Sequence, residues 1–278
     1  MKPKIKRAFL DTEDGQIFYQ TAGEGDPLLL LHMTPRSSDE FRELIPLVAE
    51  HRFTIAMDLM GVGNSDPPPR VYSIADYAQT AIALLDELGI HTCSIFGSMT
   101  GGYIAGELAA TNPDRVQKLI LCNLPRFDAE DQERLLRYDS RGFQIAEDGQ
   151  HLMQRWRSRV NYLGTGELNH RCVLDDLKCF GRPLYPGVAV ANYCLSAPER
   201  FQLIQCPTLI LSGTRALEPL EKFGLAKPKN QAWLESVIPH SQEIDISGGT
   251  MWMVNQMAEE IAQVVIDFLE RQQVTDVN

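Results

Sequence analysis

The sequence predicts an α/β fold with a mostly parallel eight-stranded sheet and helices on both faces. Continuous apolar runs at 27–32, 53–58 and 93–96 are typical of strands that other elements cover on both sides. Strand-like and helical segments alternate along much of the chain, which predicts parallel pairing through crossover helices. A strand, a glycine-flanked turn and a helix follow one another directly over 93–111. These three observations indicate the same fold class.

The other elements are assigned from local signals in chain order. Residues 7–22 contain two strand patterns joined at Glu13-Asp14-Gly15, a hairpin turn signal. An amphipathic helix is expected over about 39–50, and Ser73 caps a second helix that stops at Gly89. The further predicted elements are strands at 116–122, 206–213 and 242–246 and helices at about 229–237 and 258–270.

Residues 126–200 interrupt this alternation. They carry mixed charges, several arginines and no strong strand pattern, so we expect a helical insertion there. The sequence therefore predicts an α/β core made of residues 1–125 and 201–278, with residues 126–200 as a helical cap.

The turn at 97–101 has the glycine spacing of a nucleophile elbow. In a G-x-S-x-G elbow the central residue occupies a strained, exposed position between a strand and a helix. Gly97 and Gly101 lie two residues before and after the centre, where small residues let strand and helix approach closely. The central residue is Met99, and a methionine cannot attack a carbonyl carbon.

Five segments, taken in chain order, resemble the α/β-hydrolase fold superfamily. They are 30–35, which resembles the H-G-x-P oxyanion loop; 58–65, the D-x-x-G-x-G-x-S loop; 97–102, the elbow; 206–213, the strand before the acid; and 247–250, the histidine segment. The matching regions are 7–125 and 200–270. The resemblance implies an α/β-hydrolase fold in which the insertion is the variable cap.

The resemblance also implies where a Ser-His-acid triad would lie. The nucleophile position is Met99, the acid is expected at Ala216, and the histidine is expected at Thr250 or the next residue, Met251. None of these side chains can take the corresponding part. The sequence therefore predicts a member of the superfamily that lacks the triad at the expected positions.

The oxyanion site is the part of the machinery that the sequence retains. The residue after the nucleophile donates a backbone N–H to this site, and here it is Thr100. The resemblance makes Thr34 the second donor. Ser98, next to the elbow centre, is a third candidate catalytic group, although a serine nucleophile needs a base of its own.

The candidate substrate-binding residues are mostly apolar. Met33, Met99, Met251 and Trp252 occupy or adjoin loop ends that would face the pocket, so a largely apolar cavity is expected. Arg36 is a candidate for holding an anionic group. His32 is placed in the same set, with a role in organising the oxyanion loop as the favoured alternative. The favoured ligand is a small, flat or hydrophobic carbonyl compound.

Composition limits the partners. A net charge of -11 argues against a nucleic-acid footprint and against attraction to anionic membranes. The six cysteines show no C-x-x-C pair or metal-ligand spacing, so no metal site is expected and a reduced, cytoplasmic setting is favoured. No cofactor is expected either. No signal peptide or spanning segment of about 18 apolar residues is recognised. A small molecule is the expected partner, and a homodimer is compatible with the sequence.

Three functions follow from these features. The first is an enzyme of lyase, decarboxylase or cyclase type that stabilises an oxyanion without a serine nucleophile. The second is a hydrolase of ester or C–C bonds that uses rearranged residues such as Ser98. The third is a non-catalytic protein that keeps the pocket for a ligand.

Overall fold

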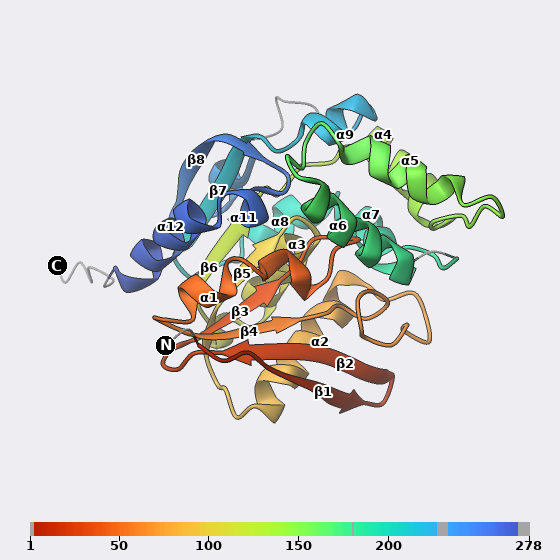
Figure 1. The fold of residues 1–278 in the computed structure, drawn as a ribbon. Coiled ribbons are helices and arrows are strands. Elements are labelled where there is room, and N and C mark those ends of the chain that lie inside the picture. The colour runs from red at the N-terminus through yellow and green to blue at the C-terminus, as the bar shows by residue number, and fades with distance from the viewer. Residues whose placement is uncertain (1–2, 180, 227–232, 272–278) are drawn as a thin grey trace.

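An eight-stranded sheet forms the centre of the molecule (Figure 1). The computed structural model describes residues 3–179, 181–226 and 233–271. The strands are β1 (Lys6–Thr12), β2 (Gly15–Ala22), β3 (Pro27–Leu31), β4 (Phe53–Met57), β5 (Cys93–Ser98), β6 (Val116–Cys122), β7 (Thr208–Arg215) and β8 (Ser241–Thr250). Their order is β1-β2-β4-β3-β5-β6-β7-β8. The β1–β2 and β2–β4 pairs are antiparallel and the others are parallel, which confirms the predicted fold class.

Helices cover both faces of this sheet, as predicted. On one face the core includes side chains from the short helices η1 (Ser38–Phe41), α1 (Ile45–Val48) and α11 (Met253–Gln256) and from α12 (Ala258–Glu270). The other face packs against α2 (Ile74–Glu87), α3 (Thr100–Thr111), α8 (Ala197–Phe201) and α10 (Trp233–Val237). The short elements η2 (Pro113–Arg115) and α9 (Glu218–Lys222) lie in connecting segments.

Local signals placed several element ends correctly. The Ser73 hydroxyl accepts a hydrogen bond from the Asp76 N–H at 3.1 Å, and the Asp76 carboxylate accepts one from the Ser73 N–H at 2.7 Å. This reciprocal capping satisfies two N–H groups that the helix itself cannot pair. The predicted hairpin at 13–15 also joins β1 to β2.

The helix expected over 39–50 is instead two short pieces, η1 and α1. Pro46 lies in the first turn of α1, where its missing N–H is tolerated. The same residue within one continuous helix would remove a hydrogen bond and clash with the preceding turn. The prediction of one helix was therefore wrong.

The last strand is longer than the predicted 242–246. It extends to Thr250, because β7 continues to Arg215 and the two residues pair. The segment 247–250, which resembles the family's histidine segment, is therefore part of the sheet. The helix expected at about 229–237 is seen as α10 from Trp233, and its predicted start lies outside the described residues.

The segment between β6 and β7, residues 123–207, is called the helical insertion below. Its helices are α4 (Ala129–Asp139), α5 (Gln150–Arg159), α6 (Gly166–Cys179), α7 (Tyr185–Tyr193) and α8. Figure 1 shows α4 to α7 together at one end of the sheet. In this insertion the buried Asp176 carboxylate pairs with both Arg155 and Arg159. The division of the chain into a core and a cap at residues 126 and 200 stays a prediction.

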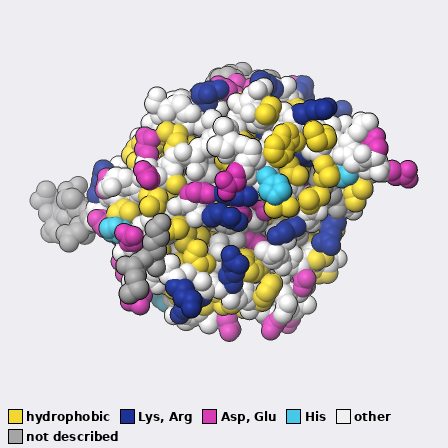
Figure 2. All heavy atoms as spheres, in the orientation of Figure 1, with side chains coloured by type: hydrophobic (Ala, Val, Ile, Leu, Met, Phe, Trp, Pro, Cys, Tyr) yellow, Lys and Arg dark blue, Asp and Glu magenta, His cyan; other side chains and the backbone are white. Residues whose placement is uncertain are grey.

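Charged side chains of both signs are interspersed on the face seen in Figure 2, and hydrophobic side chains gather over the helical insertion. Exposed apolar residues of the insertion include Met153, Val160, Leu174 and Leu177. Within the described parts of the chain, no helix has both the length and the apolar character to cross a membrane.

Candidate functional site

Met99 lies at the tip of the turn between β5 and α3. Its backbone has φ 45° and ψ -104°, a region that a residue with a side chain rarely adopts. The Met99 N–H donates to the Cys122 carbonyl at 2.9 Å, and its carbonyl accepts from the Gly102 N–H at 2.9 Å. These contacts hold the turn, called the elbow below (residues 97–101), in its strained form.

Two glycines allow the elbow to pack tightly. A Cβ atom at Gly101 would lie 2.0 Å from the carbonyl oxygen of Leu31, at the end of β3. A Cβ atom at Gly97 would lie 2.4 Å from the carbonyl oxygen of Gly101. Both distances are too short for any side chain, which confirms the expectation that small residues are needed here. The start of α3 therefore touches the strand that leads into residues 32–37.

Potential anion-binding groups lie on both sides of this contact. Thr100 is the first residue of α3, and the Met99 side chain makes no capping hydrogen bond. The first N–H groups of a helix have no intrahelical acceptor and attract negative charge. Thr34 lies in the 32–37 loop, and its buried Oγ1 has no hydrogen-bond partner among the described residues. The fold thus brings the loop of Thr34 to the N-terminus of α3.

An apolar cluster includes the elbow tip. Its buried members are Met33, Tyr162, Leu163, Leu168, Cys172 and Trp252, and Met99 and Met251 pack against them. The sequence predicts that the three methionines and Trp252 line a cavity. The structure brings all four together, but they pack against one another and against side chains of the helical insertion.

The four residues from the helical insertion were not anticipated. Leu168 and Cys172 lie four residues apart on one face of α6, a spacing visible in the sequence. The ring of Tyr162 lies 6.0 Å from that of Trp252, centroid to centroid. Helical spacing could have indicated a buried face on α6, but no local signal shows that this face covers the elbow.

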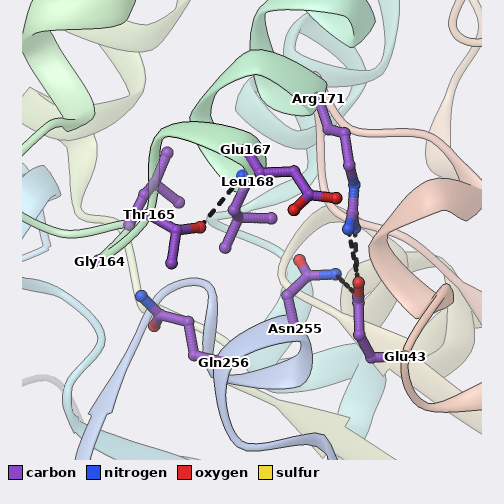
Figure 3. Close-up of a pocket in the computed structure, with 9 residues that line it drawn as sticks. Glu43, Gly164, Thr165, Glu167, Leu168, Arg171, Asn255 and Gln256 are labelled. Atoms are coloured by element: carbon purple, nitrogen blue, oxygen red, sulfur yellow. Dashed lines mark hydrogen bonds and ion pairs between the residues drawn. The ribbon is translucent and has the colours of Figure 1, made fainter.

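A pocket of about 440 Å³ opens beside the apolar cluster (Figure 3). It is lined by Glu43, Leu163, Gly164, Thr165, Glu167, Leu168, Arg171, Asn255 and Gln256. Leu163 and Leu168 belong to both the pocket and the cluster. The volume is in the range of about 300–1,000 Å³ that small-ligand sites occupy. Two side chains that line the pocket, Leu163 and Leu168, are therefore also part of the cluster against which Met99 packs.

His32 is fully buried, and both ring nitrogens bind backbone. The Leu59 N–H donates to Nε2 at 3.0 Å, so Nδ1 carries the proton and donates to the Met33 carbonyl at 2.8 Å. Burial lowers the pKa of His32, against the opposing charge of Asp58. Neither nitrogen is left for a ligand, and this geometry favours the organising role over substrate binding.

Arg36 is also buried, and it binds three partners within the protein. Its Nε donates to Asp175 at 2.7 Å. Its two terminal nitrogens each donate at 3.0 Å, one to Asn255 and the other to Asp39. The geometry therefore does not favour the anion-holding role expected from the sequence. Arg36 instead joins the 32–37 loop to α6 and α11.

Ser98 is fully buried at the end of β5. Its side chain lies on the same side of the strand as Phe96, which packs on the face covered by α1 and α12. Its hydroxyl has Glu40 and Cys122 as neighbours, and its oxygen has no hydrogen-bond partner within the described chain. Ser98 therefore faces away from the apolar cluster.

Comparison with known proteins agrees with this architecture. The model of a family described as the alpha/beta hydrolase fold matches residues 26–249, which is most of the chain. The chain belongs to the α/β-hydrolase fold family. The five segments quoted from the sequence lie within or at the edge of this match, and Met99 lies at the strand-to-helix turn where the resemblance places a nucleophile elbow.

Relatives with assigned names match only part of the chain. The soluble epoxide hydrolase of Corynebacterium sp. (strain C12) is 36% identical over 109 residues, 39% of this chain and 38% of that protein. The cis-3-alkyl-4-alkyloxetan-2-one decarboxylase of Shewanella oneidensis is 28% identical over 135 residues, 47% of this chain and 42% of that protein. The matches thus span roughly two fifths of the length of these relatives.

Solved structures match over almost the full length. The enol-lactonase from Burkholderia xenovorans LB400 has a TM-score of 0.75 and 19% identity, over 95% of this chain and 100% of that chain. At this identity the likeness describes the α/β-hydrolase fold and not a reaction.

The positions at which the sequence resemblance led us to expect the acid and the histidine lie at the ends of β7 and β8. Ala216 follows β7 directly and is buried, while the nearby Glu218 pairs with Arg215 on the surface. The Thr250 hydroxyl donates to Gln256 at 2.5 Å and accepts from the Trp252 N–H at 3.1 Å. The Thr250 hydroxyl therefore joins the end of β8 to α11 and to the residue before it.

The described residues hold no cluster of three or more His, Cys, Asp or Glu side chains arranged to bind a metal ion.

Proposed function

We propose that this α/β-hydrolase-fold protein is an enzyme that acts on a small, mostly apolar carbonyl compound without a Ser-His-acid triad. The observation that carries the proposal is the strained backbone of Met99, which keeps the elbow geometry although the side chain cannot be a nucleophile. Retained strain is characteristic of functional sites. Ala216 and Thr250 occupy the positions where the resemblance places the acid and the histidine. Neither side chain can take that part, which supports the proposal of an enzyme without the triad.

The chemistry proposed is oxyanion stabilisation. Backbone N–H groups at the start of α3 and in the 32–37 loop would donate to a substrate oxygen as negative charge develops on it. In a β-keto acid, the bond to the carboxylate breaks and carbon dioxide leaves. The electron pair moves onto the ketone oxygen, and the enolate then takes a proton from water at carbon. A relative named as a decarboxylase supports this reaction class.

Entry to the elbow is proposed to occur through the pocket of Figure 3. Leu163 and Leu168 line this pocket and also belong to the apolar cluster of Met33 and Met99. A ligand with an apolar body would displace these side chains and replace their contacts with its own. Such a site binds by burial of apolar surface, and a few polar groups fix the carbonyl oxygen.

Benzoylacetate tests the proposal because it is a flat, aromatic β-keto acid. Acetophenone formation is followed by mass spectrometry. We expect turnover by the wild type, loss of turnover in Thr34→Trp, and unchanged turnover in Ser98→Ala, since Ser98 faces away from the cluster. Absence of turnover with benzoylacetate and with aliphatic β-keto acids would count against this function.

The hydrolase alternative uses rearranged residues such as Ser98, and the burial of Ser98 does not favour that residue as the nucleophile. A fluorophosphonate probe distinguishes it, because a labelled peptide containing residues 97–102 would support a serine hydrolase. The ligand-binding alternative is compatible with the packed apolar cluster, which would supply apolar contacts to a ligand. That alternative would be supported if benzoylacetate raised the melting temperature of the protein and was recovered without conversion to acetophenone.

A further inference from the structure

Glu40 is a fully buried carboxyl group in η1, behind the elbow. Its Oε2 accepts a hydrogen bond from the Met33 N–H at 2.7 Å. Its Oε1 has no hydrogen-bond partner among the residues that the structure describes. The carboxyl group therefore binds the 32–37 loop one residue before Thr34, the proposed oxyanion donor.

The opposite side of the carboxyl group faces the end of β5. The Ser98 hydroxyl is near enough to hold down the pKa of Glu40 against burial, although the two oxygens do not have hydrogen-bonding geometry. Ser98 precedes Met99 directly. The Glu40 side chain thus fills the space between the two segments that form the proposed anion site.

Three other titratable or charged groups face Glu40. Arg36, in the preceding loop, lowers the pKa of Glu40, and Asp175 of α6 raises it. On β6, the pKa of the Cys122 thiol is raised by burial and further by the charge of Glu40. Burial has the largest effect on Glu40 and leaves its pKa raised, so the neutral acid is favoured more than in an exposed glutamate.

We propose that Glu40 is a positioning residue that fixes the 32–37 loop against the elbow. The role of this loop in catalysis rests on the proposed function, in which Thr34 donates to the substrate oxygen. Without the carboxyl group, the Met33 N–H would be buried with no acceptor, which destabilises the present position of the loop. The loop would relieve this by moving, and Thr34 would move with it. Catalytic hydrogen bonds lose strength when donors shift by about 1 Å.

Amide hydrogen exchange at Met33 and Thr34 tests the proposal directly. It is measured in the wild type, in Glu40→Leu and in Glu40→Gln, whose amide oxygen still accepts from Met33. We expect Glu40→Leu to speed exchange at both amides by about tenfold or more, and Glu40→Gln to stay within about threefold of the wild type. Glu107→Leu is the matched control, because Glu107 is a buried glutamate of α3 that pairs with Arg200 and Tyr193.

Unchanged exchange at Met33 and Thr34 in Glu40→Leu would overturn the proposal, as would equal increases in Glu40→Gln or in Glu107→Leu. If Glu40→Leu does not fold, Glu40→Asp replaces it. That variant keeps the acid but withdraws it by one methylene, so faster exchange is again expected.

Turnover of benzoylacetate provides the second measurement. Glu40→Leu is expected to lose turnover, and Glu40→Gln is expected to restore it. If the wild type shows no turnover, the proposed function fails, while hydrogen exchange still decides the role of Glu40.

Discussion

The Nε of Arg36 donates to Oδ2 of Asp175 at 2.7 Å, and both side chains are almost completely buried. Arg36 follows β3, whereas Asp175 lies on α6 of the helical insertion. The Ser37 hydroxyl also donates to Asp175, at 2.8 Å. The ion pair therefore fixes the insertion over the 32–37 loop, and the apolar cluster lies where these two parts meet.

The first prediction concerns this ion pair. Arg36→Met leaves the Asp175 carboxylate buried without its charge partner, so the free energy of unfolding should fall by about 3–5 kcal/mol. Arg36→Met combined with Asp175→Leu should cost less than the sum of the two single changes, because no buried charge remains unpaired. Urea denaturation measures all three variants. Strictly additive losses would contradict the coupling.

The second prediction tests the strain at Met99. Glycine adopts positive φ without penalty and alanine does not, so Met99→Gly should be more stable than Met99→Ala by about 1–2 kcal/mol. Met153 provides the control, since it is an exposed residue within the helix α5. There Met153→Ala should be the more stable variant by about 1 kcal/mol. If the alanine variant were more stable than the glycine variant at Met99 as well as at Met153, the elbow would be unstrained.

The third prediction concerns Asp139, the last residue of α4. Its carboxyl group is buried, and a Cβ atom added to Gly187 of α7 would lie 2.4 Å from its Oδ2. Burial raises the pKa of Asp139 to about 7. The folded protein thus keeps a proton that the unfolded chain releases above about pH 4. Its contribution to stability is complete below that pH and declines as the pH rises to about 7.

Asp139→Asn removes this dependence. Relative to the wild type, the variant should gain stability by roughly 1 kcal/mol for each pH unit between about pH 4 and 7. The measurement is urea denaturation across that range, with the exposed Asp114→Asn as control. A stability difference between Asp139→Asn and the wild type that does not change with pH would refute the assignment.

Much of the fold follows from local sequence patterns. Buried strands, the Ser73 cap and the elbow glycines each carry their signal within a few residues. The prediction of one helix over 39–50 is wrong because Pro46, inside the apolar periodicity of this segment, lies in the first turn of a separate helix. The extension of β8 to Thr250 was missed because it depends on pairing with Arg215, a distant residue.

The site was less predictable than the fold. The spacing of the family-like segments predicted that the methionines and Trp252 lie together, since the loop ends of parallel strands meet at one edge of the sheet. Leu163 and Leu168 come from the insertion, and no local pattern fixes how it lies over the elbow. The sequence likewise does not show which of many acids pairs with Arg36. Long-range pairing of this kind decides whether an arginine is free for a ligand.

The fourth prediction tests the contact between α3 and β3. Gly101→Ala places a methyl group 2.0 Å from the Leu31 carbonyl oxygen, within rigid backbone. The start of α3 must then move away from the strand, and the elbow separates from the 32–37 loop. We expect a loss of about 3 kcal/mol or more in the free energy of unfolding.

Gly166→Ala is the matched control, because Gly166, like Gly101, lies in the first turn of a helix. The nearest atom to an added Cβ there is a Trp156 ring carbon at 3.9 Å, an ordinary contact. Alanine favours the helix over glycine by about 1 kcal/mol, so this variant should be neutral or more stable. Equal effects of the two changes would mean that helix propensity, and not the approach of α3 to β3, decides the cost at Gly101. A large loss confined to Gly101→Ala would locate the constraint at the contact that brings Thr34 to the elbow.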